Sequence, residues 1–171
     1  MGVQGSGKST IGALLAKRLG VRFVDGDTLH SAENVAAMAA GRALTDAQRG
    51  PWLHAVGRVL AEGEDDGIVV ACSALKRSYR DLLREHAPEL FVVDPEGSMR
   101  LIAERISERQ HEYMPPELLQ SQYDTLEPLQ EDERGVVVDI RMDPESIVLT
   151  AAAAIRGDLF SERSARAHRH R

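Results

Sequence analysis

The stretch of sequence that decides the fold lies at the amino end and reads Gly2-Val3-Gln4-Gly5-Ser6-Gly7-Lys8-Ser9-Thr10. It matches the pattern G-x-x-x-x-G-K-[ST] at every position, which is the signature of a loop that binds phosphate groups. Glycine lets backbone N–H groups approach phosphate oxygens closely, and a helix that follows directs further N–H groups at the anion. The apolar residues Ile11, Leu15 and Leu19 have helical spacing, which favours a phosphate loop over a chance match.

Two side chains of the loop carry its chemistry. We expect Lys8 to place its charge on the β- and γ-phosphates of ATP, and the hydroxyl of Ser9 to ligate Mg²⁺. The sequence therefore predicts ATP and Mg²⁺ as cofactors. The residues expected to bind ATP are Gly2, Val3, Gln4, Gly5, Ser6, Gly7, Lys8, Ser9 and Thr10.

Size and composition bound the class of protein. A chain of 171 residues with 43% apolar and 28% charged residues is long enough for one well-buried domain. The net charge of −6 argues against nucleic-acid binding, which requires a basic face. The single cysteine, Cys72, fits a reducing cytoplasm, and no apolar run reaches the roughly 20 residues of a membrane span. We therefore expect a cytoplasmic protein that binds neither nucleic acid nor membranes.

Apolar spacing and capping residues predict an alternation of helices and strands. Helix starts are indicated at Ser9, Ser31, Ser98 and Asp143, and a basic helix is expected at about 76–84. Thr45 has capping-box spacing, and Pro51 fits the first turn of a helix. Short apolar runs predict strands at 21–24, 67–72, 90–93 and 136–138. This order predicts an α/β fold with a parallel sheet in the middle of three layers.

Three stretches stand apart from this alternation. Residues 109–128 contain two adjacent prolines and mixed polarity, which predicts a lid or an excursion from the core. Residues 157–171 are polar and basic without periodicity, and we expect a disordered tail. At the other end, a buried strand is expected to lead into the phosphate loop, but only Met1 precedes Gly2. The first strand of the fold is therefore absent, either because the true start lies upstream or because the chain is truncated.

Two carboxylates follow the 21–24 strand, in Asp25-Gly26-Asp27. Ligands bind where parallel strands end, so one carboxylate could hold hydrated Mg²⁺ and the other accept a proton from an attacking hydroxyl. A plain strand-to-loop turn explains the same residues equally well. Asp94 and Asp139 also end strands, so the pattern alone does not name the partner of Mg²⁺.

Polar residues at helical spacing mark further candidates. His30 and Asn34 would share a helix face, although surface polarity explains them as well. The row Lys76, Arg80 and Arg84 is either an ordinary solvated stripe or a site for an anion such as a sugar-acid carboxylate.

Two arginines, Arg105 and Arg109, flank the start of the lid-like segment. An arginine over the γ-phosphate offsets charge on its oxygens, although helix-surface charge explains this pair too. We expect Cys72 to be a buried packing residue rather than a nucleophile, because the sequence shows no activating base beside it.

The sequence resembles the gluconokinase family, within the P-loop kinases that are similar to nucleoside-monophosphate kinases. The resemblance covers about residues 2–155. Beyond the phosphate loop, its more selective motifs are Phe23-Val24-Asp25-Gly26-Asp27, Cys72-Ser73-Ala74-Leu75-Lys76, Tyr79-Arg80-Asp81-Leu82-Leu83-Arg84 and Thr125-Leu126-Glu127-Pro128.

The resemblance implies ATP-dependent phosphorylation of D-gluconate on its terminal hydroxyl, which gives 6-phospho-D-gluconate. It implies that Asp27 orients or deprotonates that hydroxyl and that Asp25 is an outer-shell partner of Mg²⁺. It implies catalytic roles for Lys8, Arg105 and Arg109 as well. The implied substrate contacts are Asp27, His30, Asn34, Arg49, Lys76 and Arg80.

The resemblance further implies one P-loop kinase domain over residues 1–156, with a small helical lid at about 109–128. The lid departs from the family pattern. Where the family usually reads Arg-x-Gly-His-Phe, this chain reads Arg109-Gln110-His111-Glu112-Tyr113. The replaced glycine and histidine could change lid closure or nucleotide contact, so no role is assigned to Glu112.

The sequence also leaves other functions open. The nearest is a kinase of another small hydroxylated metabolite, such as shikimate or adenylylsulfate, because the basic row does not separate sugar acids from one another. A nucleotide switch would need a guanine-reading Asn-Lys-x-Asp, which does not occur. An inactive, truncated P-loop protein is the third alternative, and a homodimer also stays open.

Overall fold

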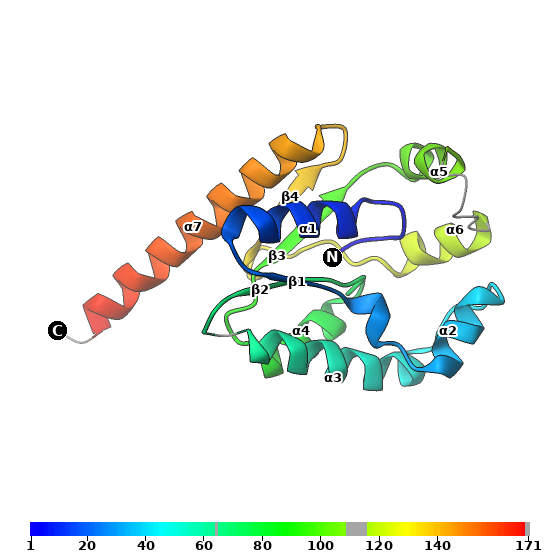
Figure 1. Ribbon diagram of the computed structural model, residues 1–171, viewed down its shortest axis with the longest axis horizontal. Coiled ribbons are helices and arrows are strands. Elements are labelled where there is room, and N and C mark those ends of the chain that lie inside the picture. The colour runs from blue at the N-terminus through cyan, green and yellow to red at the C-terminus, as the bar shows by residue number, and fades with distance from the viewer. Residues whose placement is uncertain (64, 109–115, 170–171) are drawn as a thin grey trace.

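The computed structural model describes residues 1–63, 65–108 and 116–169, and its helices and strands alternate along the chain (Figure 1). The helices are α1 (Lys8–Leu19), α2 (Ala32–Ala39), α3 (Asp46–Glu62), α4 (Arg77–His86), α5 (Met99–Ser107), α6 (Pro116–Thr125) and α7 (Pro144–Arg169), with a 3₁₀ turn η1 (Gly26–Leu29). The strands are β1 (Arg22–Asp25), β2 (Ile68–Ala71), β3 (Val92–Glu96) and β4 (Gly135–Asp139). The predicted α/β alternation is confirmed.

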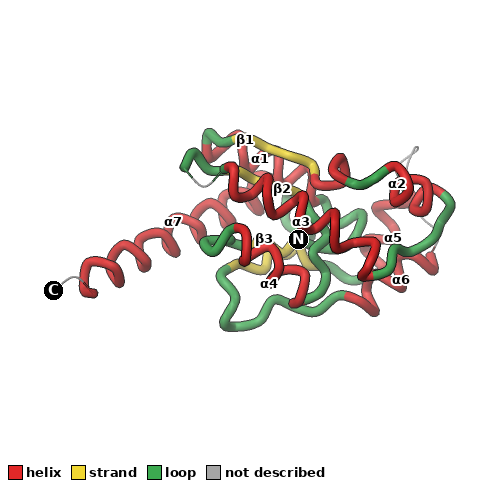
Figure 2. The backbone as a smooth tube through the Cα atoms, turned by 90° about the horizontal axis from the view of Figure 1, so that it is seen from below, coloured by secondary structure: helices red, strands yellow, loops and turns green. Residues whose placement is uncertain are grey.

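The strands lie between two layers of helices. α1 contacts β1, β2 and α7 on one side, and α3 contacts β2 and α4 on the other. In Figure 1, α1 lies above β1 and β2, α3 and α4 lie below them, and α7 lies beside β4; Figure 2 shows the molecule from below. α2, α5 and α6 lie together at one end in both views. The predicted three-layer arrangement is therefore present.

The sheet is divided into two parallel pairs. β1 pairs with β2, with Phe23 opposite Val69, and β3 pairs with β4, with Val93 opposite Val136. Within the described residues no ladder joins β2 to β3. The four expected strands are all present, but they form two half-sheets rather than the one continuous sheet that their order suggested.

Side-chain caps start three of the helices where the sequence placed them. Ser31 accepts a hydrogen bond from the N–H of Asn34, and Ser98 accepts one from the N–H of Leu101. Thr45 and Gln48 form a complete capping box. α3 therefore begins at Asp46, and Pro51 lies inside the helix rather than in its first turn, because the capping box satisfies the first free N–H groups.

The carboxyl end of the chain is more ordered than expected. α7 continues to Arg169, through the segment for which a disordered tail was expected. The first part of α7 is held by buried Ile147 and Ala151, and the added turns contain alanine and arginine, which favour helix. Figure 1 shows this end of α7 projecting away from the body of the protein.

The core consists of three apolar clusters. One lies between α1, β4 and α7, and contains Ile11, Leu15, Val138, Ile147, Val148, Ala151 and Ala152. A second joins α3, α4 and the end of β2, and contains Trp52, Leu53, Val56, Cys72, Ala74, Tyr79 and Leu83. The third fixes the phosphate loop to α5 and α6, and contains Val3, Leu75, Ile102, Ile106, Leu119 and Ile140. The loop is thus anchored by its own buried valine.

Among the described residues, no helix has the length and apolar character needed to cross a membrane. The same part of the chain contains no cluster of three or more histidine, cysteine, aspartate or glutamate side chains that could hold a metal ion by themselves.

Candidate active site

The phosphate loop connects Met1 to α1 through three glycines in the left-handed region. Gly2, Gly5 and Gly7 have φ values of 123°, 81° and 93°, which other residues rarely adopt. A Cβ on Gly5 would lie 2.7 Å from Cγ1 of Ile106, so α5 packs directly behind the loop. α1 starts at Lys8, and its first N–H groups have no partners within the helix, as an anion site requires.

The two reactive side chains of the loop are held in defined positions. The Nζ of Lys8 donates a hydrogen bond to the carbonyl oxygen of Val3 at 2.8 Å, which places the ammonium group over the loop. The Oγ of Ser9 donates to Oδ2 of Asp25 at 2.8 Å. The structure therefore brings together the two residues that were predicted to hold Mg²⁺, and joins the loop to the end of β1.

The turn after β1 is clamped between β2 and α3. Oδ1 of Asp25 accepts a hydrogen bond from the N–H of Asp27 at 3.1 Å, and Nε1 of Trp52 donates to the carbonyl oxygen of Gly26 at 2.7 Å. A Cβ on Gly26 would lie 2.6 Å from the carbonyl oxygen of Ala71. These contacts fix the backbone of the turn and leave the side chain of Asp27 exposed.

Cys72 is a buried thiol that experiences the charges of both Lys8 and Asp27. Burial raises the pKa of the Cys72 thiol to about 11, the charge of Lys8 lowers it, and the charge of Asp27 raises it. Both charges therefore act on the same buried sulfur. A thiol with so high a pKa is protonated at neutral pH, in agreement with the packing role expected for Cys72.

The three carboxylates that could hold Mg²⁺ differ in what they contact. Asp139 binds Arg141, and these hydrogen bonds lower its pKa to about 2. Asp94 is buried behind the loop, where burial raises its pKa. Asp25 contacts Ser9. The structure thus favours Asp25, which spacing alone did not.

His30 and Asn34 differ in what their polar atoms do. The ring of His30 stacks on Trp52 with centroids 4.2 Å apart, and its Nδ1 is buried without a hydrogen-bond partner in the described structure. Burial lowers the pKa of His30, while the Asp27 charge raises it and the Arg49 charge lowers it. Nδ2 of Asn34 donates to the carbonyl oxygen of Gln48, so this amide joins α2 to α3.

Two basic side chains act on Asp46, at the start of α3. Nζ of Lys76 contacts Oδ2 of Asp46 at 2.7 Å, and the hydroxyl of Tyr79 donates to the same carboxylate. The charge of Arg49 acts on both His30 and Asp46, so Arg49 and Lys76 both lie near this acid. Asp46 was not predicted, because no local signal links it to a lysine thirty residues away.

Arg80 is placed differently from the prediction of a substrate contact. Its side chain is fully buried, and its Nε and Nη2 bind the two carboxylate oxygens of Glu133 at 2.7 and 2.6 Å. Arg84 binds the same carboxylate at 2.7 Å. Of the predicted basic row, Arg80 is therefore buried against Glu133 and is not available to a substrate, whereas Lys76 contacts Asp46.

The two predicted lid arginines have separate outcomes. Nη2 of Arg105 donates to the carbonyl oxygen of Ile140 at 2.5 Å, which ties the last turn of α5 to the end of β4. Arg109 lies outside the described residues, together with the altered lid residues Gln110, His111, Glu112 and Tyr113. Of the segment predicted to form a lid, the structure describes α6, whose Gln122 accepts a hydrogen bond from the N–H of Gln4 at 2.7 Å.

Comparison with known proteins identifies the relatives of this site. The Shikimate kinase family profile matches residues 4–156. The "Probable gluconokinase" of Mus musculus is 41% identical over 175 residues, covering 91% of this chain and 95% of the relative. The "Thermosensitive gluconokinase" of Escherichia coli (strain K12) is 38% identical over 159 residues, covering 91% and 84%.

The crystal structure of a gluconokinase from Sinorhizobium meliloti 1021 has 43% sequence identity and a TM-score of 0.85, and the match covers 95% of this chain and 94% of that one. The chain belongs to the gluconokinase family. The resemblance that its motifs indicated is therefore confirmed, together with the P-loop kinase fold. Two of the selective motifs of the gluconokinase family, Asp25-Gly26-Asp27 and Cys72 to Lys76, meet at the edge of the phosphate loop in this structure.

Replacing Gly26 with alanine (Gly26→Ala) should destabilise the gluconokinase fold at its site. The new methyl group would collide with the Ala71 carbonyl, and relief of that contact would push β1 away from β2. We expect the free energy of unfolding to fall by about 1–3 kcal/mol, measured by urea titration. Gly50→Ala, inside α3, meets no atom within 4 Å and, like Gly26, has no positive φ, so it is the control for adding a methyl group without a collision. An equal loss in both variants would contradict the steric explanation.

Proposed function

We propose that this chain transfers the γ-phosphoryl group of ATP to the terminal hydroxyl of D-gluconate, giving ADP and 6-phospho-D-gluconate. The observation that carries the proposal is the 2.8 Å hydrogen bond between Ser9 and Asp25, which holds the Asp27 turn against the phosphate loop. The choice of acceptor rests on the gluconokinase relatives, at 41% and 38% identity over most of the chain.

The loop and Lys8 are assigned to the triphosphate. Backbone N–H groups of the loop and of the first turn of α1 would bind the phosphate oxygens, and the ammonium group of Lys8 already lies over the loop. Together they would offset the negative charge that spreads over the transferring phosphoryl group.

Ser9 and Asp25 fit Mg²⁺ by the chemistry of their donors. Both offer hard oxygen atoms, and the two side chains are in direct contact. Ser9 and Asp25 would hold Mg²⁺ there, and the ion would supply positive charge that offsets part of the charge on the phosphates. Both oxygens of Asp25 accept hydrogen bonds, from Ser9 and from the N–H of Asp27, which supports an outer-shell role for this carboxylate.

Asp27 is assigned to the acceptor hydroxyl. Its exposed carboxylate would accept the hydroxyl proton while the hydroxyl oxygen bonds to the γ-phosphorus and the bond from that phosphorus to the leaving oxygen of ADP breaks. Arg109 stays a proposed lid contributor. Arg105 is given a positioning role instead, because its guanidinium binds the Ile140 carbonyl.

The sugar-acid carboxylate is assigned to the basic residues that lie near Asp46. Arg49 and Lys76 supply positive charge there, and the buried Nδ1 of His30 supplies a polar atom that lacks a protein partner in the described structure. A buried polar atom without a partner is uncommon and suits a ligand hydroxyl.

A panel of acceptors tests the proposed reaction. The full chain is incubated with ATP and, separately, with gluconate, shikimate or adenylylsulfate, and ADP release is measured. We expect kcat/KM for gluconate to exceed the others by at least about 100-fold, because polar groups that the wrong acceptor leaves unpaired are costly. Turnover of shikimate or adenylylsulfate without turnover of gluconate would replace gluconate with that acceptor.

Replacing Asp25 with asparagine (Asp25→Asn) should raise the Mg²⁺ concentration needed for half-maximal activity by about 10- to 100-fold. The amide keeps the shape of the side chain but removes the negative charge next to Ser9. Activity is measured against Mg²⁺ at saturating ATP and gluconate. Asp65→Asn, at an exposed site elsewhere, serves as the control. An unchanged Mg²⁺ requirement would show that Asp25 has no role in binding the metal.

A further inference from the structure

Two histidine side chains that the proposed reaction does not use meet across α3 and α4. Nδ1 of His54 in α3 and Nε2 of His86 in α4 form a hydrogen bond of 2.9 Å. The two rings lie edge to face, with centroids 5.3 Å apart and planes at 79°. Imidazole nitrogen is the commonest metal ligand among protein side chains. Two such nitrogens that meet at one point are therefore the starting geometry of a metal site.

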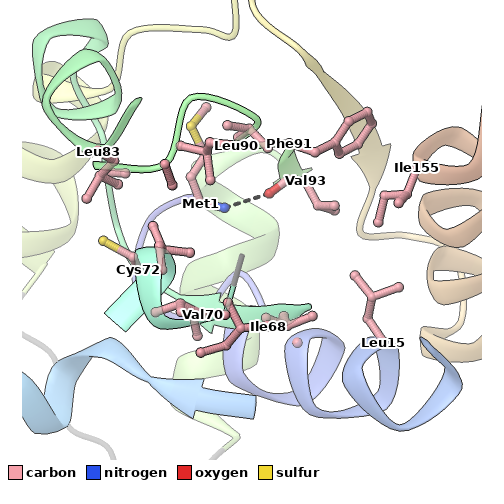
Figure 3. Close-up of a pocket in the computed structure, with 18 of the residues that line it drawn as sticks. Met1, Leu15, Ile68, Val70, Cys72, Leu83, Leu90, Phe91, Val93 and Ile155 are labelled. Atoms are coloured by element: carbon pink, nitrogen blue, oxygen red, sulfur yellow. Dashed lines mark hydrogen bonds between the residues drawn. The ribbon is translucent and has the colours of Figure 1, made fainter. Parts of the chain in front are cut away.

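The packing of the two helices holds this pair in place. α3 and α4 lie side by side in both views (Figure 1, Figure 2). The buried cluster that joins them contains Trp52, Leu53, Val56, Tyr79 and Leu83. Leu83, one turn before His86, reaches the apolar cavity between the half-sheets together with Cys72 (Figure 3). His86 itself does not line this cavity, so its ring faces α3 rather than the interior.

A glycine in α3 makes room for the second ring. A Cβ on Gly57 would lie 2.4 Å from Cδ2 of His86, so the imidazole lies directly against the backbone of α3. Glycine is a poor helix former, and this close approach explains its presence inside α3. His86 is half-buried, whereas His54 is exposed. One imidazole is thus fixed by packing, and the other can adjust its position in contact with water.

The histidine pair is the second polar link between these helices. At their starts, Lys76 and Tyr79 both bind the carboxylate of Asp46. His54 follows Asp46 in α3, and His86 follows Tyr79 in α4, in each case by about two turns. The helices therefore run in the same direction and are linked twice. An ion held by the histidines would fix the orientation of α4, which begins just after Lys76.

We propose that His54 and His86 are the protein ligands of a site for a divalent transition-metal ion of the Zn²⁺ type, which joins α3 to α4. Two nitrogens at about 2.0–2.1 Å from a tetrahedral ion lie about 3.4 Å apart. The pair therefore has to open by about 0.5 Å from its hydrogen-bonded distance. The described residues add no third histidine, cysteine, aspartate or glutamate to the pair, so water completes the coordination.

The protons of the pair permit this exchange. In the hydrogen bond, one of the two facing nitrogens carries a proton and the other accepts it. A metal ion needs a lone pair on both, so the donor ring moves its proton to its other nitrogen. Neutral imidazole suits Zn²⁺, Ni²⁺ and Cu²⁺, whereas Mg²⁺ prefers oxygen ligands. The site therefore differs in chemistry from the one proposed for Mg²⁺ at Ser9 and Asp25.

The test measures the melting temperature of the full chain, without ATP or gluconate, in ZnCl₂ or MgCl₂. At about 100 times its dissociation constant, taken from titration calorimetry, Zn²⁺ should raise the melting temperature by about 5–10 °C. His54→Gln and His86→Gln should each weaken Zn²⁺ binding by at least about 10-fold and lose most of this gain. The response to Mg²⁺ should be the same in the full chain and in both variants.

A local readout distinguishes the link between the helices from a general effect of Zn²⁺. The N–H of Ala87 bonds to the carbonyl oxygen of Leu83 at 2.9 Å, in the last turn of α4. A helix end opens by fraying, so an ion that holds His86 against α3 should slow amide hydrogen exchange at Ala87 by at least about 10-fold. The same amide should not respond to Zn²⁺ in His86→Gln.

A matched control removes the same number of imidazoles and one more, in His111→Gln/His168→Gln/His170→Gln, and should keep the gain in melting temperature. No gain with Zn²⁺, or an equal gain in His54→Gln and His86→Gln, would reduce the pair to a hydrogen bond and overturn the proposal. Loss of the gain in the triple variant would place the ion elsewhere in the chain and overturn it as well. These readouts use neither nucleotide nor acceptor, so they succeed or fail separately from the proposed function.

Discussion

Replacing Asp27 with asparagine (Asp27→Asn) will lower kcat by about 10²- to 10⁴-fold and leave the affinity for ATP within about twofold. The amide has nearly the same size as the carboxylate, so the turn held by Gly26 and Trp52 should persist. It cannot accept the proton of the acceptor hydroxyl. The loss should therefore fall on the chemical step, which steady-state kinetics with saturating gluconate and ATP will measure.

Two controls make the Asp27 result specific. Asp65→Asn removes an exposed carboxylate far along the chain and should leave kcat unchanged. Equilibrium ATP binding by Asp27→Asn, measured without acceptor, checks that the phosphate loop is intact. A variant that keeps its kcat would remove Asp27 from the reaction, and one that loses ATP binding would assign it to the nucleotide.

Replacing Glu133 with glutamine (Glu133→Gln) will destabilise the fold by about 3–5 kcal/mol. The Glu133 side chain is fully buried, and its carboxylate accepts hydrogen bonds from Arg80, Arg84 and the N–H of Gln130. The variant leaves the guanidinium of Arg80 buried without its counter-charge, which is costly in a medium of low polarity. Urea titration will measure the loss. Glu131→Gln, at an exposed neighbouring position, should change stability by less than about 0.5 kcal/mol.

The Glu133 pair also predicts a response to acid. Burial opposes ionisation, but hydrogen bonds from Arg80, Gln130 and Arg84 outweigh it and lower the pKa of Glu133 from 4.5 to about 2. Because the folded pKa is lowered, its stabilising effect is present above pH 4.5 and is lost as the pH falls toward 2. Glu133→Gln should therefore lose less stability than the unchanged chain over this interval. Parallel acid-unfolding curves would contradict the pair as the cause.

Arg80 connects two of the selective motifs that lie outside the phosphate loop. Arg80 bonds the carbonyl oxygens of Ala74 and Leu75 as well as those of Glu127 and Pro128. It thereby fixes the segment after β2 to the segment after α6. The carbonyl oxygen of Ser73, which accepts a hydrogen bond from the N–H of Gly2, belongs to the first of these segments. Arg80 is therefore a positioning residue, and its effect on the loop passes through the backbone.

Local patterns in the sequence predicted what local physics determines. The phosphate loop, the caps at Ser31 and Ser98, and the capping box at Thr45 depend on residues within a few positions of one another. Asp25 was a candidate on the same local grounds, but preferring it to Asp94 and Asp139 required its contact with Ser9. These features could therefore be predicted from the sequence alone.

Pairings between residues that lie far apart in the sequence could not be predicted. Spacing alone does not show that Arg80 meets Glu133, 53 residues away, or that Lys76 meets Asp46. A basic row at helical spacing therefore suggested one anion site. In the fold, Arg80 is instead buried against Glu133, and Lys76 contacts Asp46. The division into half-sheets likewise depends on which strand edges find partners, and residue periodicity along one strand does not contain that information.

A crystal structure of the full chain with gluconate and a non-hydrolysable ATP analogue would test most directly whether the loop and Asp27 share one reaction site. We predict the γ-phosphate against Nζ of Lys8, and the terminal hydroxyl of gluconate about 2.6–3.2 Å from the carboxylate of Asp27, facing that phosphate. Gluconate bound away from Asp27, or with its carboxylate rather than its terminal hydroxyl toward the γ-phosphate, would contradict the proposed reaction.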